Sequence, residues 1–310
     1  MTPGLSLDTD DACSQGAVKN DVGVSVLSDH VCHLGEGPIY DADTDTLFWF
    51  DILGRKLLEK KLSGGVTIVH DLPEMTSALA VINEGHQLLV TESGLHIRDV
   101  RTGAITSYFS IEADNPLTRS NDCRVHPCGA FWISTMGRKA EPKGGSIYWF
   151  FKGEFCKLVS DITIPNSICF SPDGSVAYYT DTRENILFRI GCDPATGRPI
   201  GEAGMFFDHS GKKGGLDGSV VDVDGVLWNA RWGAGRLDAY SPQGKRIRSI
   251  DITTRQPSCP AFVGANADRL VLTSAWEGMN AATRKRDKRA GMTMLLDLPV
   301  KGRLEPRVLI

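Results

Sequence analysis

A recurring unit of about 40 to 50 residues constrains the fold of this chain more than any other feature. Each unit places a turn residue just before a short apolar or aromatic strand that ends in a polar residue, as at 129–134 and 174–181. The turn residues stand at 45, 85, 129, 174, 225 and 268, which are 40, 44, 45, 51 and 43 residues apart. Six units of this length, each with room for four short strands, predict an all-β protein, a six-bladed β-propeller with four-stranded blades.

Burial explains why such units assemble into a ring. A single four-stranded blade cannot cover both of its faces, whereas a ring covers each blade with the next and leaves only short edges. We expect the early strand at 24–27 to close the ring by joining the last blade near 292–296. Two packed β domains would need a linker, and no Pro- or Ser-rich stretch marks one. The prediction is a single propeller domain over 23–310, preceded by a disordered extension over 1–22.

Composition supports this fold and excludes several classes of partner. The 33 glycines among 310 residues fit a chain with many tight turns. A formal charge of −4 indicates no nucleic-acid partner and no anionic membrane surface. The sequence contains no run of about 18 apolar residues, and its first twenty residues do not resemble a signal peptide. The eight cysteines form no C-x-x-C pair, so we expect reduced thiols and a cytoplasmic protein.

Four polar residues share one position within the repeat, eight or nine residues before the turns at 45, 129, 174 and 225. They are Glu36, Asn121, Asn166 and Asp217. Each alone could be an ordinary turn residue, but Asp173 and Asp224 already occupy the turn positions of their repeats. Equal offsets in a ring bring side chains together around the central axis, and carboxylate and amide oxygens suit a hard divalent cation. The sequence therefore predicts a cation site at one mouth of the central channel.

In these segments the chain resembles the SMP-30/gluconolactonase/regucalcin family of sugar lactonases, over roughly 24–308. The segment 35–38 is similar to the family's G-E-G-P motif, and 119–122 followed by Gly129 is similar to its R-x-N-D-G…D-P-x-G stretch. The segment 165–174 is similar to P-N-G-[IL]-x-[FW]-S-P-D-G, and 216–218 to L-D-G. The motifs are specific in combination.

The resemblance implies a lactonase that opens an aldonic acid (sugar) lactone to the free acid. One divalent cation (Ca²⁺, Zn²⁺, Mg²⁺ or Mn²⁺) would be held by Glu36, Asn166 and Asp217, and Arg119 and Asn121 would contact the substrate. Because a cation polarises a carbonyl group and activates water, Asp217 beside that water is the candidate general base. Arg119 would orient ring hydroxyls or stabilise the oxyanion.

Two residues depart from the family's motifs. Cys123 and Ser167 stand where the family has glycine, each one or two positions after a candidate site residue. Because each adds a side chain at a place where the family has none, we expect both to alter the shape of the substrate pocket.

Other functions compete with this interpretation. One is an esterase or organophosphate hydrolase on a similar propeller, and another is a non-enzymatic Ca²⁺-binding propeller. A serine nucleophile is disfavoured because the chain has no G-x-S-x-G motif. His33 lies near the supposed mouth and could act as a base, although a structural role is favoured. Trp232 is expected either to line the mouth or to pack between blades, and the loops at 135–138 and 276–280 to influence substrate choice.

Overall fold

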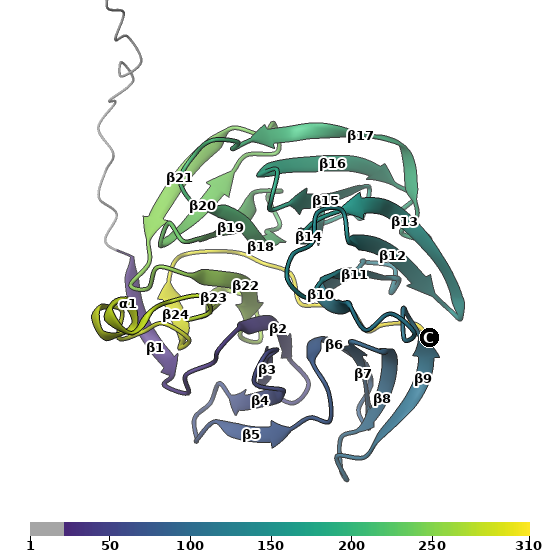
Figure 1. Ribbon diagram of the computed structural model, residues 1–310, viewed down its shortest axis with the longest axis horizontal. Helices are drawn as coiled ribbons and strands as arrows, with labels where there is room; N and C mark the ends of the chain where they lie inside the picture. Colours follow the sequence, from purple (N-terminus) through teal and green to yellow (C-terminus); the bar gives the residue numbers. More distant parts are fainter. Residues whose placement is uncertain (1–21) are drawn as a thin grey trace, which may run out of the picture.

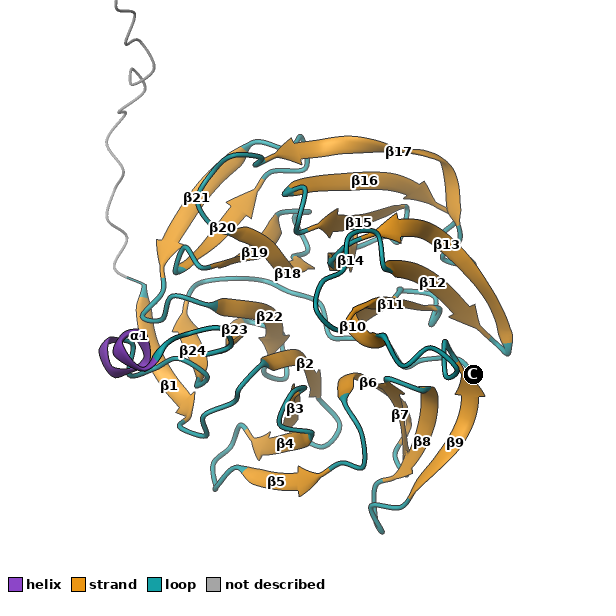
Figure 2. Ribbon diagram, in the orientation of Figure 1, coloured by secondary structure: helices purple, strands orange, loops and turns teal. Residues whose placement is uncertain are grey.

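The computed structural model describes residues 22–310, so the extension predicted for 1–22 lies, apart from its last residue, outside the described residues. The described chain forms six antiparallel sheets of four strands each. They are arranged as blades around a central axis (Figure 1), and strands dominate the described chain (Figure 2). The predicted all-β, six-bladed propeller is confirmed, and the alternative of two packed β domains is wrong.

Each of the first five blades uses four consecutive strands, running from the axis to the rim. The first blade contains β2 (Gly35–Asp41), β3 (Thr46–Asp51), β4 (Lys56–Lys61) and β5 (Ile68–Asp71). The second contains β6 (Thr76–Asn83), β7 (His86–Thr91), β8 (Gly94–Asp99) and β9 (Ile105–Ser110). The third contains β10 (Thr118–Val125), β11 (Phe131–Gly137), β12 (Gly145–Phe151) and β13 (Glu154–Ile162). The fourth contains β14 (Pro165–Phe170), β15 (Val176–Asp181), β16 (Ile186–Cys192) and β17 (Pro199–Asp208). The fifth contains β18 (Gly215–Val221), β19 (Leu227–Trp232), β20 (Arg236–Tyr240) and β21 (Arg246–Asp251).

The sixth blade closes the ring with strands from both ends of the described chain. It contains β22 (Pro257–Val263), β23 (Arg269–Ser274), β24 (Thr293–Asp297) and, as its outermost strand, β1 (Gly23–Ser28). β1 runs antiparallel to β24 with Gly23 opposite Asp297 and Val26 opposite Met294, as predicted. The short helix α1 (Ala281–Arg286) stands between β23 and β24. No helix of the described residues is long and apolar enough to cross a membrane.

The six turn positions of the sequence repeat all lie between the innermost and second strands of a blade. At three of them, Gly129, Gly174 and Gly225, the backbone φ angles are 92°, 73° and 77°. Only glycine adopts these angles without a steric penalty from Cβ. This requirement explains why glycine recurs at the turn position of the repeat.

The hydrophobic core is divided into layers between neighbouring blades. One layer combines Leu88 and Val90 of the second blade with Val125 and Phe131 of the third. Full burial of side chains of this size stabilises the fold by about 1.5–3 kcal/mol each. Each blade is therefore stable only when the next one covers it.

A C-terminal strap, residues 299–310, follows β24 and crosses the end of the channel near the turns that join innermost and second strands (Figure 1, yellow). Backbone hydrogen bonds join the strap to such turns or strand ends in four blades: Gly302 N–H to Ala267 O (2.8 Å), Val223 N–H to Lys301 O (2.9 Å), Val308 N–H to Val81 O (2.9 Å) and Leu309 N–H to Gly129 O (2.9 Å). The strap covers this end of the channel. We therefore expect a ligand site at the opposite mouth, where the innermost strands begin.

Candidate active site and metal centre

Irregularities in the innermost strands position the candidate site residues. The pairing register shifts near the start of these strands, between Glu36 and Ile39 in β2 and between Asn166 and Cys169 in β14. β10 and β18 shift at the corresponding places, next to Asn121 and Asp217. A bulge leaves residues unpaired and turns their side chains away from the regular alternation. The polar side chains can therefore face the channel although their strands are otherwise buried in apolar layers.

All five candidate residues of the sequence line one cavity of about 380 Å³ at this mouth. Arg119, Asn121, Asn166 and Asp217 are each at most 8% exposed, and Glu36 is half-buried. The other lining residues are Leu34, Met136, Arg138, Lys139, Ala140, Ile164, Thr182, Trp232 and Glu277. The structure thus brings together every site residue that the sequence proposed.

A chain of hydrogen bonds fixes these side chains across three blades. Arg119 Nη1 donates to Asn121 Oδ1 (2.8 Å), and Asn121 Nδ2 donates to Asn166 Oδ1 (3.0 Å). Asn166 Nδ2 donates in turn to Thr182 Oγ1 (2.9 Å), and the Thr182 hydroxyl donates to Leu216 O (2.7 Å). These bonds point the oxygen of Asn166 toward Asn121 and its nitrogen toward Thr182, and they leave the second lone pair of that oxygen for another ligand.

The carboxyl groups of the site lie close enough to oppose one another's ionisation. Removal from water raises the pKa of Glu36 to about 8, and the charge of Asp122 adds to this shift. Burial also raises the pKa of Asp217 well above its usual range, with further contributions from Glu36 and Asp122. Burial lowers the pKa of Arg119, although Glu277 and Glu36 favour its charged form. The site concentrates negative charge where solvent cannot screen it.

The donor set fits a divalent cation bound through oxygen atoms. Two carboxylates that disfavour each other's charge and one oriented amide oxygen are hard ligands, and a cation between them would offset their repulsion. Within residues 22–310, no group of three or more His, Cys, Asp or Glu side chains has metal-binding geometry. A site here would therefore depend on the amide of Asn166 in addition to Glu36 and Asp217.

The two departures from the family's motifs do not line this cavity, so the expectation that they alter its shape is wrong. The Cys123 side chain packs in the apolar layer between the second and third blades. Ser167 is fully buried, and its hydroxyl donates to the backbone oxygen of Asp217 at 2.5 Å. Ser167 follows its site residue directly, and Cys123 stands two positions after Asn121, where pairing with Ile133 resumes.

Several cavity residues were not proposed as site residues, and they share a second position in the repeat. Arg138, Thr182, Trp232 and Glu277 stand 9, 8, 7 and 9 residues after the turns at 129, 174, 225 and 268. Each follows the second strand of its blade or ends it, where the chain turns back at the same mouth. The same comparison of repeats, applied after the second strand, would have found them. The structure also places Trp232 at the mouth, which is one of the two positions expected for it.

His33 has a packing role at the rim of the site. Its ring stacks on Trp276 with 3.9 Å between ring centroids and 5° between the planes. Its backbone oxygen accepts the amides of Trp276 and Glu277, both at 3.1 Å. His33 thereby holds the loop that carries Glu277 into the cavity, and the structural role favoured for it agrees with these contacts.

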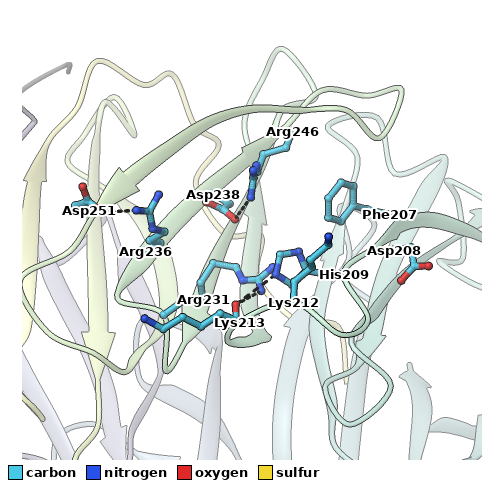
Figure 3. A pocket seen from close by; sticks show the side chains of 11 residues that line it. Phe207, Asp208, His209, Lys212, Lys213, Arg231, Arg236, Asp238, Arg246 and Asp251 are labelled. Atoms are coloured by element: carbon cyan, nitrogen blue, oxygen red, sulfur yellow. Dashed lines mark hydrogen bonds and ion pairs between the residues drawn. The ribbon is translucent and has the colours of Figure 1, made fainter. Parts of the chain in front are cut away.

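A second cavity, of about 650 Å³, lies between β17 and the strands of the fifth blade. Figure 3 shows Arg231, Lys213 and His209 close together on one side of it, with the Arg236–Asp251 ion pair on the other. Burial, with the charge of Arg231 as the second cause, lowers the pKa of His209 to about 4. This cationic cavity contains none of the residues proposed from the repeat, and its lining does not suit a hard cation.

Comparison with known proteins identifies the family of this chain. The SMP-30/Gluconolactonase/LRE-like region matches residues 34–276, a span that begins beside Glu36 and ends one residue before Glu277. The chain belongs to this family. The resemblance seen in the sequence motifs is thus confirmed across five of the six blades and part of the last.

Members of the SMP-30/gluconolactonase family align with the chain over nearly their whole length. A Rhizobium meliloti (strain 1021) protein assigned as a sugar lactone lactonase is 49% identical over 280 residues, which are 90% of this chain and 95% of that protein. The L-arabinolactonase of Azospirillum brasilense is 34% identical over 278 residues, 86% of this chain and 89% of its own. The crystal structure of a calcium-binding protein, regucalcin, from Agrobacterium tumefaciens str. C58 is 47% identical, with a TM-score of 0.92 over 93% of this chain and 98% of that one.

Proposed function

We propose that this protein is a lactonase that opens a polyhydroxylated sugar lactone to its acid, using one divalent cation held by Glu36, Asn166 and Asp217. The observation that carries the proposal is the convergence of two carboxylates and an oriented amide oxygen beside a buried arginine in one cavity. Lactonase relatives support the reaction, and the calcium-binding relative supports a cation. Carbohydrate metabolism in the cytoplasm is the corresponding setting.

A bound cation would polarise the lactone carbonyl and make nearby water more acidic. Asp217 would accept a proton from a water molecule while the oxygen of that water attacks the carbonyl carbon of the lactone. When the ring C–O bond breaks, the same carboxyl group would return the proton to the leaving ring oxygen. Arg119 would donate to the developing negative charge on the carbonyl oxygen, and Asn121 would orient the substrate. Arg119 suits this role because its guanidinium group is fixed by Ser120 O and Asn121 Oδ1, both at 2.8 Å.

The neutral, hydroxylated nature of the proposed substrate fits the balance of charge in the cavity. Its lining includes three carboxyl groups and three cationic groups, those of Glu36, Asp217, Glu277, Arg119, Arg138 and Lys139. A cavity that offers both acceptors and donors can bind hydroxyl groups, which both donate and accept hydrogen bonds. A purely apolar ester would offer no hydrogen bonds to the buried Arg119 and Asp217, which disfavours the esterase alternative.

Removal of the cation is the direct test of this function. We expect chelator-treated and dialysed protein to lose at least about 100-fold in lactone hydrolysis, because carbonyl polarisation and water activation are both lost. Addition of Ca²⁺, Mg²⁺, Mn²⁺ or Zn²⁺ one at a time, with hydrolysis followed by acid release, identifies the ion that restores the rate. Full activity after metal removal would contradict the proposal, and stoichiometric binding without hydrolysis of any lactone would favour a Ca²⁺-binding propeller.

Substrate choice separates the lactonase from an esterase or organophosphate hydrolase. We expect kcat/KM for pentono- and hexonolactones to exceed that for aryl esters and phosphotriesters by at least about 100-fold, because the site's buried polar groups need hydroxyl partners. The measurement is a panel of both substrate classes with the restored metal. An equal or higher kcat/KM for aryl esters would show that the lactone assignment is wrong.

A further inference from the structure

The fully buried Ser167 occupies the same structural position in the fourth blade as Gly37 in the first. Glu36 and Asn166 are each the last paired residue before the register shift of their strands, and Gly37 and Ser167 follow them directly. Both have left-handed backbone angles, with φ of 56° at Gly37 and 58° at Ser167. Glycine adopts this conformation freely, whereas serine is strained in it. A buried serine at such a position calls for a compensating interaction.

The neighbouring blade supplies that interaction. A Cβ atom built at Gly37 would meet the backbone oxygen of Ser77, in the second blade, at 2.1 Å, so the first blade has no room for a side chain there. In the fourth blade the serine hydroxyl instead donates a hydrogen bond of 2.5 Å to the backbone oxygen of Asp217, in the fifth blade. Asn229 Nδ2 donates to the same oxygen at 2.9 Å. The peptide that carries the Asp217 side chain is thus held from two blades at once.

We infer that Ser167 is a positioning residue: its hydroxyl fixes the backbone of Asp217 and thereby sets the affinity of the proposed cation site. The inference rests on the proposed function, because it takes Asp217 as a cation ligand. Ser167 does not line the cavity and touches no substrate. Its left-handed conformation next to Asn166, together with its bond to Asp217, links two of the three proposed ligands through a single residue.

The test measures cation affinity by calorimetry in metal-free protein, separately from catalysis. For Ser167→Ala, which keeps the strained backbone and loses the donor, we expect the dissociation constant of the activating cation to rise about tenfold, as for other residues that orient metal ligands. Ser167→Gly removes the strain as well as the donor. The same weakening in both variants would assign the effect to the hydroxyl, and wild-type affinity in Ser167→Gly would overturn the inference.

Ser77→Ala is the matched control. Ser77 is a buried serine on the innermost strand of the second blade, and its hydroxyl has no hydrogen-bond partner. We expect this variant to bind the cation like the wild-type protein. If Ser167→Ala also does so while Asp217→Asn does not bind, Ser167 has only a packing role and the proposed function stands. If the wild-type protein binds none of Ca²⁺, Mg²⁺, Mn²⁺ and Zn²⁺, the proposed function is wrong and this inference with it.

Discussion

Replacing Asp217 with asparagine is expected to lower kcat/KM for a sugar lactone by about three orders of magnitude, the middle of the range for loss of a general base. The two side chains have nearly the same shape, but an amide cannot accept a proton from water. It is also a weaker ligand for a hard cation, so we expect cation affinity to fall in parallel. The backbone bonds from Ser167 and Asn229 to residue 217 do not involve the side chain and are retained.

Three measurements together make this result interpretable. Acid release gives kcat/KM, calorimetry gives the cation dissociation constant, and urea unfolding reports whether the fold is intact. Because the substitution removes a buried carboxyl group that is costly to ionise, the free energy of unfolding of the metal-free protein should not fall. Asp224→Asn, at an exposed turn of the same blade, is the control and should behave like the wild-type protein. Unchanged hydrolysis and metal content in Asp217→Asn would refute both roles assigned to this residue.

Replacing Glu305 with glutamine is expected to destabilise the fold by about 3 kcal/mol, the cost of leaving a buried charge without its partner. Glu305 belongs to the C-terminal strap, and its Oε1 lies 2.7 Å from Arg124 Nη1. The side chain of Arg124 is 8% exposed and that of Glu305 18%. Glutamine preserves the shape but not the charge, so the buried guanidinium group of Arg124 loses its ion pair. Urea unfolding followed by tryptophan fluorescence measures the change.

A second ion pair of the same strap provides the comparison. Arg307 Nη2 lies 2.6 Å from Asp43 Oδ2, but these side chains are 45% and 63% exposed. Solvent screens such a pair, so Asp43→Asn should leave the free energy of unfolding nearly unchanged. Equal destabilisation by the two substitutions would mean that strap attachment, and not burial of the Arg124 charge, determines stability at this end of the channel.

The repeat predicted most of the architecture because a ring requires equal units. Blades must have similar strand number and length to cover one another, so turn positions such as Gly129, Gly174 and Gly225 recur in the sequence. The same regularity located Glu36 and Asp217, since residues at one offset before the turn face one axis. Residues beyond the second strands, such as Glu277, share a second offset of seven to nine residues after the turn, and only the offset before the turn was compared. The offset before the turn therefore predicted one part of the cavity lining, and the offset after the second strand accounts for another.

The repeat does not predict the direction in which an individual side chain points. Cys123 and Ser167 stand beside site residues in the sequence, and proximity alone suggested that they shape the pocket. The bulge interrupts the alternation of faces that makes a strand predictable, so neighbours in sequence point to different environments. For Ser167 the decisive facts are a left-handed φ of 58° and a partner 50 residues away, neither of which leaves a pattern in the sequence.

The closing of the ring by β1 and β24 bears on how the protein folds during synthesis. The first five blades are each made from consecutive strands, so each can form once it and the next blade that covers it have left the ribosome. The sixth cannot, because β1 emerges first and its partner is 270 residues away at Leu295. Until then β1 is an unpaired strand edge on a growing chain, a type of surface on which chaperones act and from which aggregation starts. The pairing of β1 with β24 completes the ring, and it cannot form until β24 has been synthesised, after all the other strands.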